Sequence, residues 1–151
     1  VYAGDRLELG GGILLEVLHP PPRLMTGTEA DGNNNSLVLR LTWGQAEFLL
    51  TGDIGIEAEQ LLIHSTRTLS ADLLKVAHHG SGGSSGSEFL SAVAPAYAVI
   101  SVGADNRFGH PDGDVLERLA AQGGVTVLRT DQAGTIEFTT DGQRLWVSTE
   151  R

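Results

Sequence analysis

The stretch "SLVLRLTWGQAEFLLTGD", Ser36 to Asp53, carries the clearest structural pattern in the sequence. Two runs rich in β-forming residues, Leu37–Thr42 and Ala46–Leu50, flank the turn Trp43–Gln45, and this arrangement predicts a β-hairpin. The second run is apolar without interruption, which is typical of a strand that is buried on both faces. We therefore expect this strand to lie inside a larger sheet.

The chain on either side of the hairpin supplies the remaining elements. Further strands are expected at residues 14–22, 72–77, 97–103, 125–130, 134–140 and 144–149, and helices at residues 56–64, 87–95 and 112–124. Residues 23–35 are polar and rich in turn formers, so they are expected to form a loop. This order predicts one layered α/β domain over residues 1–151, with a mixed sheet and helices packed on one face.

The sequence of each expected helix also indicates which residues pack or where the helix begins and ends. The first is expected to pack through one broad face made by Ile56, Gln60, Leu61, Leu62 and Ile63. Ser87 is placed to cap the second helix, and Pro95 lies beyond its end. Asp112 or Asp114 is placed to open the third.

Length and composition bound the class of protein. The chain has 151 residues, of which 40% are apolar and 19% charged, and this is ordinary for one globular domain. No apolar run approaches the ~18 residues of a membrane span. Residues 1–12 carry charges and glycines and do not resemble a signal peptide. Because the first residue is Val1, we expect the chain to be a piece of a longer protein.

Cysteine content and charge restrict the chemistry further. The chain has no cysteine, so any transition-metal site must use His, Asp or Glu. The net charge of −9 opposes binding to nucleic acid unless metal ions or another domain assist. Simple solubility is the plainer interpretation of this acidity.

Three apolar strands end in polar, reactive groups: Thr51–Asp53, His78–Ser81 and Ser101–Pro111. In open α/β sheets, ligands bind beyond the carboxyl ends of strands, so these three ends are expected to converge on one cleft. The residues expected to meet there are Asp53, His78, His79, Asn106 and His110. A carboxylate and imidazoles without thiolate suit zinc or manganese, and Gly80–Gly86 offers backbone N–H groups for a phosphate ahead of a helix.

Each signal has a plainer alternative. The Thr-Gly-Asp sequence can be a turn cap, and His110 can cap the following helix. Adjacent side chains on a strand point in opposite directions, so one histidine of the pair can be packed and the other solvated. His19 and His64 are expected to be structural, with His64 near a helix C-terminus where a cation is favoured.

Taken together, "LLTGD" (Leu49–Asp53), "KVAHHGS" (Lys75–Ser81) and "SVGADNRFGHP" (Ser101–Pro111) resemble the ComEC family of competence DNA-uptake channel proteins. The resemblance covers about Leu14 to Phe138 and corresponds to the carboxyl-terminal half of that family's metallo-β-lactamase-like domain. It implies one half of an αβ/βα sandwich. The complete domain holds two divalent ions, Zn²⁺ or Mn²⁺, that activate water for hydrolysis. It also implies a domain carried on the outer face of a bacterial membrane protein.

The resemblance also implies roles for individual residues. Asp53 matches a bridging metal ligand and His79 a second ligand. His78, Asn106 and His110 match catalytic positions around the scissile phosphate, and Gly80 and Ser81 match substrate-binding positions. The implied activity is a nuclease or phosphodiesterase that degrades the DNA strand that is not imported.

One departure from the family is clear, because its upstream His-x-His-x-Asp-His motif is absent from this chain. We therefore expect weak or no metal binding and no cleavage by these residues alone. The expected partners are DNA, the missing amino-terminal half-domain and the membrane channel domain. Two alternatives stay open. The first is a non-catalytic interaction module that associates with copies of itself, and the second is a hydrolase of a small phosphodiester or ester.

Overall fold

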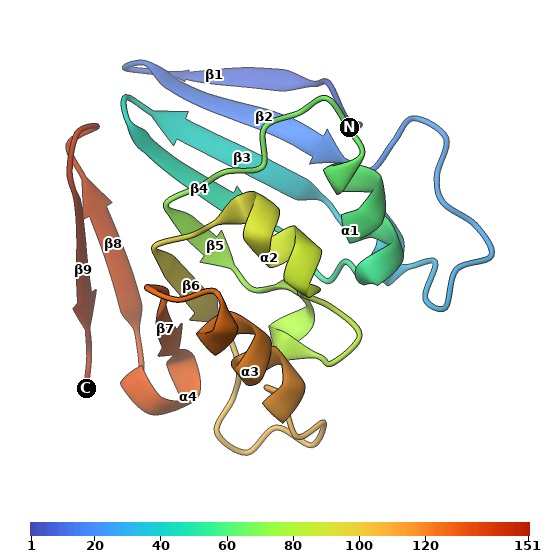
Figure 1. Cartoon of the computed structure of the whole chain (residues 1–151). Helices are drawn as coiled ribbons and strands as arrows, with labels where there is room; N and C mark the ends of the chain where they lie inside the picture. Colours follow the sequence, from blue (N-terminus) through green and yellow to red (C-terminus); the bar gives the residue numbers. More distant parts are fainter.

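Seven strands form one mixed sheet in the computed structural model, which describes residues 1–151 (Figure 1). The strands are β1 (Arg6–Gly10), β2 (Ile13–His19), β3 (Val38–Trp43), β4 (Ala46–Leu50), β5 (Leu73–Lys75), β6 (Tyr97–Ile100) and β7 (Thr126–Arg129). They are ordered in the sheet as in the sequence. The pairs from β1 to β4 are antiparallel and those from β4 to β7 are parallel. A separate hairpin, β8 (Ile136–Thr140) and β9 (Leu145–Thr149), ends the chain.

Three helices lie on one face of this sheet (Figure 1). They are α1 (Ile56–Ile63), α2 (Ser87–Val93) and α3 (Gly113–Ala121), each in the connection between neighbouring parallel strands. Short turns of helix occur as η1 (Asn33–Asn35), η2 (Ala77–Gly80) and α4 (Thr130–Ala133). The predicted α/β class, with a mixed sheet and helices on one face, is confirmed. The likeness to half of a metallo-β-lactamase sandwich stays a prediction.

The core lies between the helices and the parallel strands. Leu49, Leu74 and Ala98 are aligned by register across β4, β5 and β6, and each is fully buried. The helices contribute Leu62, Phe89 and Leu119 to the same core. Because side chains alternate along a strand, this register places one continuous apolar row against the helices.

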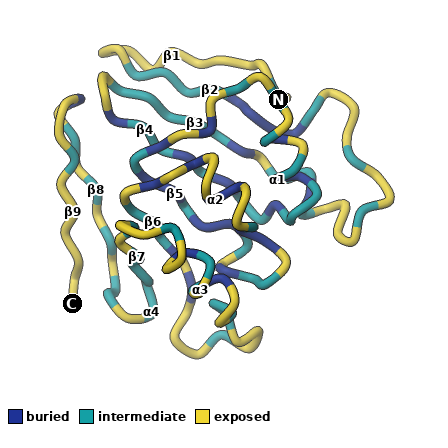
Figure 2. The backbone as a smooth tube through the Cα atoms, viewed as in Figure 1, coloured by how far each residue is buried: buried dark blue, intermediate teal, exposed yellow.

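The opposite face of the sheet carries a second apolar row that no helix covers. Register aligns its members across β1 to β6 as Leu7, Leu15, Leu41, Phe48, Leu73 and Tyr97. The terminal hairpin covers one end of this row, where the rings of Phe138 and Tyr97 meet at 5.4 Å. Figure 2 shows the result: β1 is exposed along its length, whereas the residues of β4 and β5 are buried or intermediate.

Several expectations about the elements need correction. Residues 6–10 form strand β1, which the sequence analysis did not assign. Strand β5 has three residues and not six, because the chain turns into η2 directly after it. Gly86, not Ser87, is the N-cap of α2. In α1 the buried residues are Ala58, Glu59 and Leu62, whereas Leu61 is exposed, so the predicted packing face was partly wrong.

No helix has the length and apolar character needed to cross a membrane.

Candidate functional site

The end of β4 is tied to the end of β5 before the chain reaches Asp53. The buried Thr51 hydroxyl donates a hydrogen bond to the Lys75 carbonyl at 2.6 Å. Gly52 then turns with φ +55°, and an added Cβ there would lie 2.9 Å from Ser36 Cβ. A side chain at this position would be strained in conformation and crowded, so the turn requires glycine. It presents Asp53 beyond the sheet with its side chain 41% exposed.

The two adjacent histidines do not continue a strand, so the strand premise behind their expected opposite directions was wrong. His78 has φ 48° and His79 has φ 56°, so both occupy the left-handed region within η2. This conformation costs about 1–3 kcal/mol at each non-glycine residue, and it concentrates at functional sites. The amide of His78 donates to the Gly52 carbonyl at 3.1 Å, and the Asp112 amide donates to the Gly80 carbonyl at 2.9 Å. These bonds hold the strained segment between the end of β4 and the start of α3.

His79 is oriented by the end of β6. Its Nδ1 lies 2.7 Å from the carbonyl oxygen of Ser101. A carbonyl can only accept, so Nδ1 carries a proton, and in the neutral imidazole Nε2 presents a lone pair. That Nε2 lies 3.6 Å from Oδ1 of Asp53. Two acceptor atoms therefore face each other across a gap that opens to solvent.

This pair fits two ligands of a divalent ion. Bonds of about 2.1 Å from zinc to nitrogen and oxygen, at a tetrahedral angle, place two ligand atoms about 3.4 Å apart. Metal-bound histidines commonly donate their other ring N–H to a backbone carbonyl, as His79 does to Ser101. The structure contains no group of three or more His, Asp or Glu side chains arranged to hold a metal. Asp53 and His79 therefore offer an incomplete ligand set.

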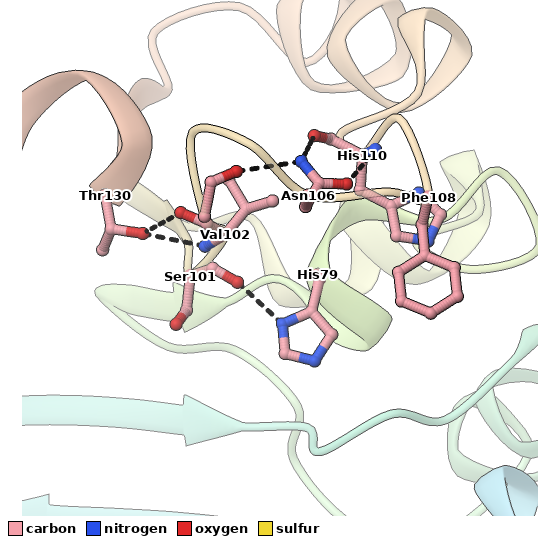
Figure 3. A pocket seen from close by; sticks show the side chains of 8 residues that line it. His79, Ser101, Val102, Asn106, Phe108, His110 and Thr130 are labelled. Carbon is pink, nitrogen blue, oxygen red and sulfur yellow. Dashed lines mark hydrogen bonds between the residues drawn. The ribbon is translucent and has the colours of Figure 1, made fainter.

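The predicted site is divided between two neighbouring hollows. His79, Asn106 and His110 line a pocket of about 490 Å³ (Figure 3). His78 and Ser81 line a smaller hollow of about 220 Å³. The rings of His78 and His110 approach edge to face at 6.0 Å, so His110 lies where the two hollows adjoin. All five residues expected to meet thus lie in one region, but the two adjacent histidines face different spaces.

Asn106 has a structural task in this region. Its Nδ2 donates to the carbonyls of Gly103 and His110 at 2.9 and 2.8 Å, and its Oδ1 accepts from the His110 amide at 2.9 Å. These three bonds close the loop between β6 and α3 (Figure 3). The Asn106 side chain therefore shapes the pocket by fixing the loop that carries His110.

The segment Gly80–Gly86 does not offer the free amides that the sequence suggested for a phosphate. The Glu59 carboxylate accepts hydrogen bonds from the amides of Ser85 and Gly86, and the Asp112 carboxylate accepts one from Gly82. Three amides of the segment are thus already bound to carboxylates within the chain. The expectation of a backbone phosphate cradle here was wrong for these groups, because the protein supplies its own anions.

A guanidinium completes this arrangement around the segment. The Arg118 guanidinium donates to the carbonyls of Gly82, Ser84 and Ser85 at 2.9–3.1 Å. Burial raises the pKa of Glu59 to about 7, although the amides of Gly86 and Ser85 and the charge of Arg118 act in the opposite direction. Glu59 and Arg118 hold the segment after His79 from two sides, one binding its amides and the other its carbonyls.

Several residues that build the site were not predicted from the sequence. Glu59 and Arg118 fix the segment after the histidines, Thr130 bonds the backbone of Val102 at 2.8 Å, and Phe108 lines the larger pocket. Phe108 lies inside Ser101–Pro111, one of the stretches that carry the family resemblance, and this was the available signal. Arg118 gave none, because its spacing is that of an ordinary surface residue of a helix.

The other two histidines are structural, as expected. His19 is fully buried, and its Nε2 lies 2.8 Å from the Asn34 carbonyl. His64 caps the end of α1, with Nδ1 2.7 Å from the Gln60 carbonyl.

The fold and the site together define an α/β protein whose strands end in polar residues beside two hollows. The chain is similar to three characterised relatives. It is 46% identical to ComE operon protein 3 of Bacillus subtilis (strain 168) over 109 residues, 72% of this chain and 14% of the relative. It is 39% identical to Competence protein ComA of Neisseria gonorrhoeae over 128 residues, 84% of this chain and 18% of the relative. It is 42% identical to Recombination protein 2 of Haemophilus influenzae over 93 residues, 61% of this chain and 11% of the relative.

The chain is therefore homologous, over most of its length, to competence proteins of the ComEC family. It spans less than a fifth of the length of these relatives. No protein-family model matches it.

Proposed function

We propose that this chain is the carboxyl-terminal half of a metallo-β-lactamase-like hydrolase domain, acting in competence as a nuclease on the DNA strand that is not imported. Its amino-terminal half, which carries the absent His-x-His-x-Asp-His motif, and a membrane channel domain are its proposed partners. In this proposal a bacterial membrane protein carries the domain on its outer face. The homology to competence proteins supports the setting.

The observation that carries the proposal is the pairing of His79 with Asp53. The lone pair of Nε2 faces a carboxylate oxygen at 3.6 Å, and the opposite ring nitrogen is anchored on Ser101. A divalent ion bound there would supply the polarisation of a phosphate and the activation of a water. The segment that carries His79 is strained in conformation and is held by Gly52 and Asp112. If Asp53 and His79 had only a structural role, the two exposed acceptors facing each other would not explain this strain.

The remaining site residues have distinct tasks in this proposal. His79 and Asp53 bind an ion, His110 borders the pocket in which the phosphodiester lies, and Asn106 holds His110 in place. His78 and Ser81 line the adjoining hollow, where a leaving group or a flanking nucleotide fits. Gly80 allows the close approach of Pro111, since an added Cβ would lie 2.6 Å from Pro111 Cβ.

Metal binding tests the ligand assignment directly. The isolated chain should bind Zn²⁺ or Mn²⁺ weakly, because two ligands are fewer than the four of a typical zinc site. In calorimetric titrations, His79→Ala and Asp53→Ala should each abolish the heat of metal binding that the unsubstituted chain gives. His64→Ala, which changes an exposed histidine outside the site, should leave it unchanged. A tight stoichiometric site that survives both site substitutions would show that the assignment is wrong.

Cleavage tests the activity in the complete domain. With the upstream half supplied, covalently or by mixing, we expect divalent-dependent cleavage of DNA that a chelator stops and Asp53→Ala abolishes. His79→Ala should lower metal content, whereas His78→Ala should lower turnover with metal content preserved. Inactivity of the complete, metal-loaded domain would contradict the nuclease proposal and favour a non-catalytic module.

The uncovered sheet face favours a second candidate, a module that associates through this face. Five members of its apolar row, from Leu7 to Phe48 and Tyr97, keep part of their surface open to solvent. Apolar patches of more than a few hundred Å² commonly mark interaction sites. Light scattering should therefore find dimers or larger species of the isolated chain, and Leu41→Glu should dissolve them. A monomer at high concentration would contradict this candidate.

A further inference from the structure

The loop between β6 and α3 presents an aromatic ring to solvent at the edge of the larger pocket. Phe108 is 67% exposed, more than any other aromatic side chain of the chain, and it lines the same pocket as His79 and His110 (Figure 3). Leaving an aromatic side chain in water forgoes much of the free energy that its burial would provide. The exposure therefore calls for a reason that the core does not supply.

The ring is held in a defined position. Asn106 closes the loop with three hydrogen bonds, two of them to His110. The rings of Phe108 and His110 stack at 5.9 Å with an interplanar angle of 14°. The Arg107 guanidinium lies 5.0 Å from the centre of the Phe108 ring. A fixed loop thus presents an aromatic face, an imidazole and a guanidinium as one stack.

Flat π-systems beside a guanidinium are the elements that proteins use to stack unpaired nucleobases. Stacking does not depend on a positively charged surface, and this matters in a chain with net charge −9. Bases within a duplex are already stacked on their neighbours and cannot reach such a ring. We propose that Phe108 is a base-stacking platform that gives the site its preference for an unpaired nucleic-acid strand. The inference rests on the proposed function, because it assumes that the pocket receives a phosphodiester.

The test compares two single strands of equal charge, with and without bases, and a duplex. The isolated 151-residue chain is titrated, without metal, with a short oligothymidylate, the same-length abasic strand and a short duplex, and NMR shift changes at the pocket are followed. The base-containing strand should bind roughly tenfold more tightly than the abasic strand. The duplex should bind no better than the abasic strand.

Substitutions test whether Phe108 causes the difference in affinity between the base-containing and abasic strands. Phe108→Ala and Phe108→Leu should both erase the preference for the base-containing strand, the second despite keeping an apolar side chain. Phe108→Trp should keep or increase it. Trp146→Ala, which removes an exposed aromatic on β9 away from the pocket, should leave it unchanged.

Equal binding of the base-containing and abasic strands would overturn the proposal. So would an unchanged preference in Phe108→Ala, or no binding of either strand at millimolar concentration. The measurement needs neither metal nor cleavage, so its result does not depend on whether the complete domain proves to be a nuclease.

Discussion

The parallel and antiparallel parts of the sheet are built differently, although β4 belongs to both. In the parallel part, β4 to β7, the connections carry helices and the central residues Leu49, Leu74 and Ala98 are fully buried. In the antiparallel part, β1 is exposed at all five residues. Asp53, His78 and His79 all follow the ends of strands in the parallel part. A strained segment such as His78–His79 needs a well-packed support, and the parallel part is where the chain supplies it.

The largest expected difference between the two parts is in core packing. Leu74→Ala, at a fully buried position of β5, should lower the free energy of unfolding by about 3–5 kcal/mol, because it leaves a cavity among packed side chains. Leu7→Ala, at a 55% exposed position of β1, should change it by about 0.5 kcal/mol or less. Urea denaturation of both variants measures this. Similar losses would show that β1 is covered in solution, for example by a second copy.

The buried carboxylate of the parallel part predicts a pH dependence. Burial raises the pKa of Glu59 from its ordinary 4.5 to about 7. A raised pKa means that the folded chain favours the protonated group, so its contribution is complete below pH 4.5 and is lost as pH rises through 7. At about 1.4 kcal/mol for each pKa unit, the loss is on the order of 3 kcal/mol.

Comparison with Glu59→Gln isolates this group, since the two proteins share every other titrating residue. The stability of the wild type relative to the variant should fall between pH 4.5 and pH 8 in urea denaturation. A difference that stays constant, or rises with pH, would contradict the assignment of a raised pKa.

Two glycines with positive φ give the most closely matched comparison and the smallest expected difference in stability. Gly80 has φ +82°, and an added Cβ would lie 2.6 Å from Pro111. Gly11, in the β1–β2 turn, has φ +60° and nothing within 4 Å. Gly80→Ala should cost about 2–3 kcal/mol through conformation and crowding, and Gly11→Ala about 1 kcal/mol through conformation alone. Thermal unfolding of the two variants should separate these contributions. Equal losses of stability would show that Pro111 can move aside without a cost in free energy.

Much of the fold was predictable where the hydrophobic pattern and the turn residues agree. The hairpin around Gly44 and the alternation of strands with helices after Asp53 follow directly from that pattern. Strand β1 was missed because its residues Arg6–Gly10 mix charge and glycine and bury nothing. The face of α1 was misjudged because Glu59 is buried, and a carboxylate is buried this completely only when it has specific partners.

The clustering of the residues at the strand ends was predictable, whereas their backbone conformation was not. Strand ends bring Asp53 and His79 together, as expected from the topology of parallel sheets. That His78 and His79 both adopt positive φ could not be foreseen, since residues other than glycine rarely do so. The occupation of the Gly82, Ser85 and Gly86 amides depends on carboxylates from α1 and from the start of α3, and local sequence does not reveal such partners.

The strand order has a consequence for how the chain folds. Every strand from β1 to β7 pairs with its neighbour in sequence, so each new strand closes only the connection to the strand before it, onto a sheet that already exists. The sheet can therefore grow in the direction of synthesis, as the chain leaves the ribosome. The hairpin β8–β9 is the exception, because the Gln45 amide bonds to the Gly142 carbonyl across most of the chain. We expect this docking to be the last and slowest event, joining the final residues to the strand pair that formed among the first.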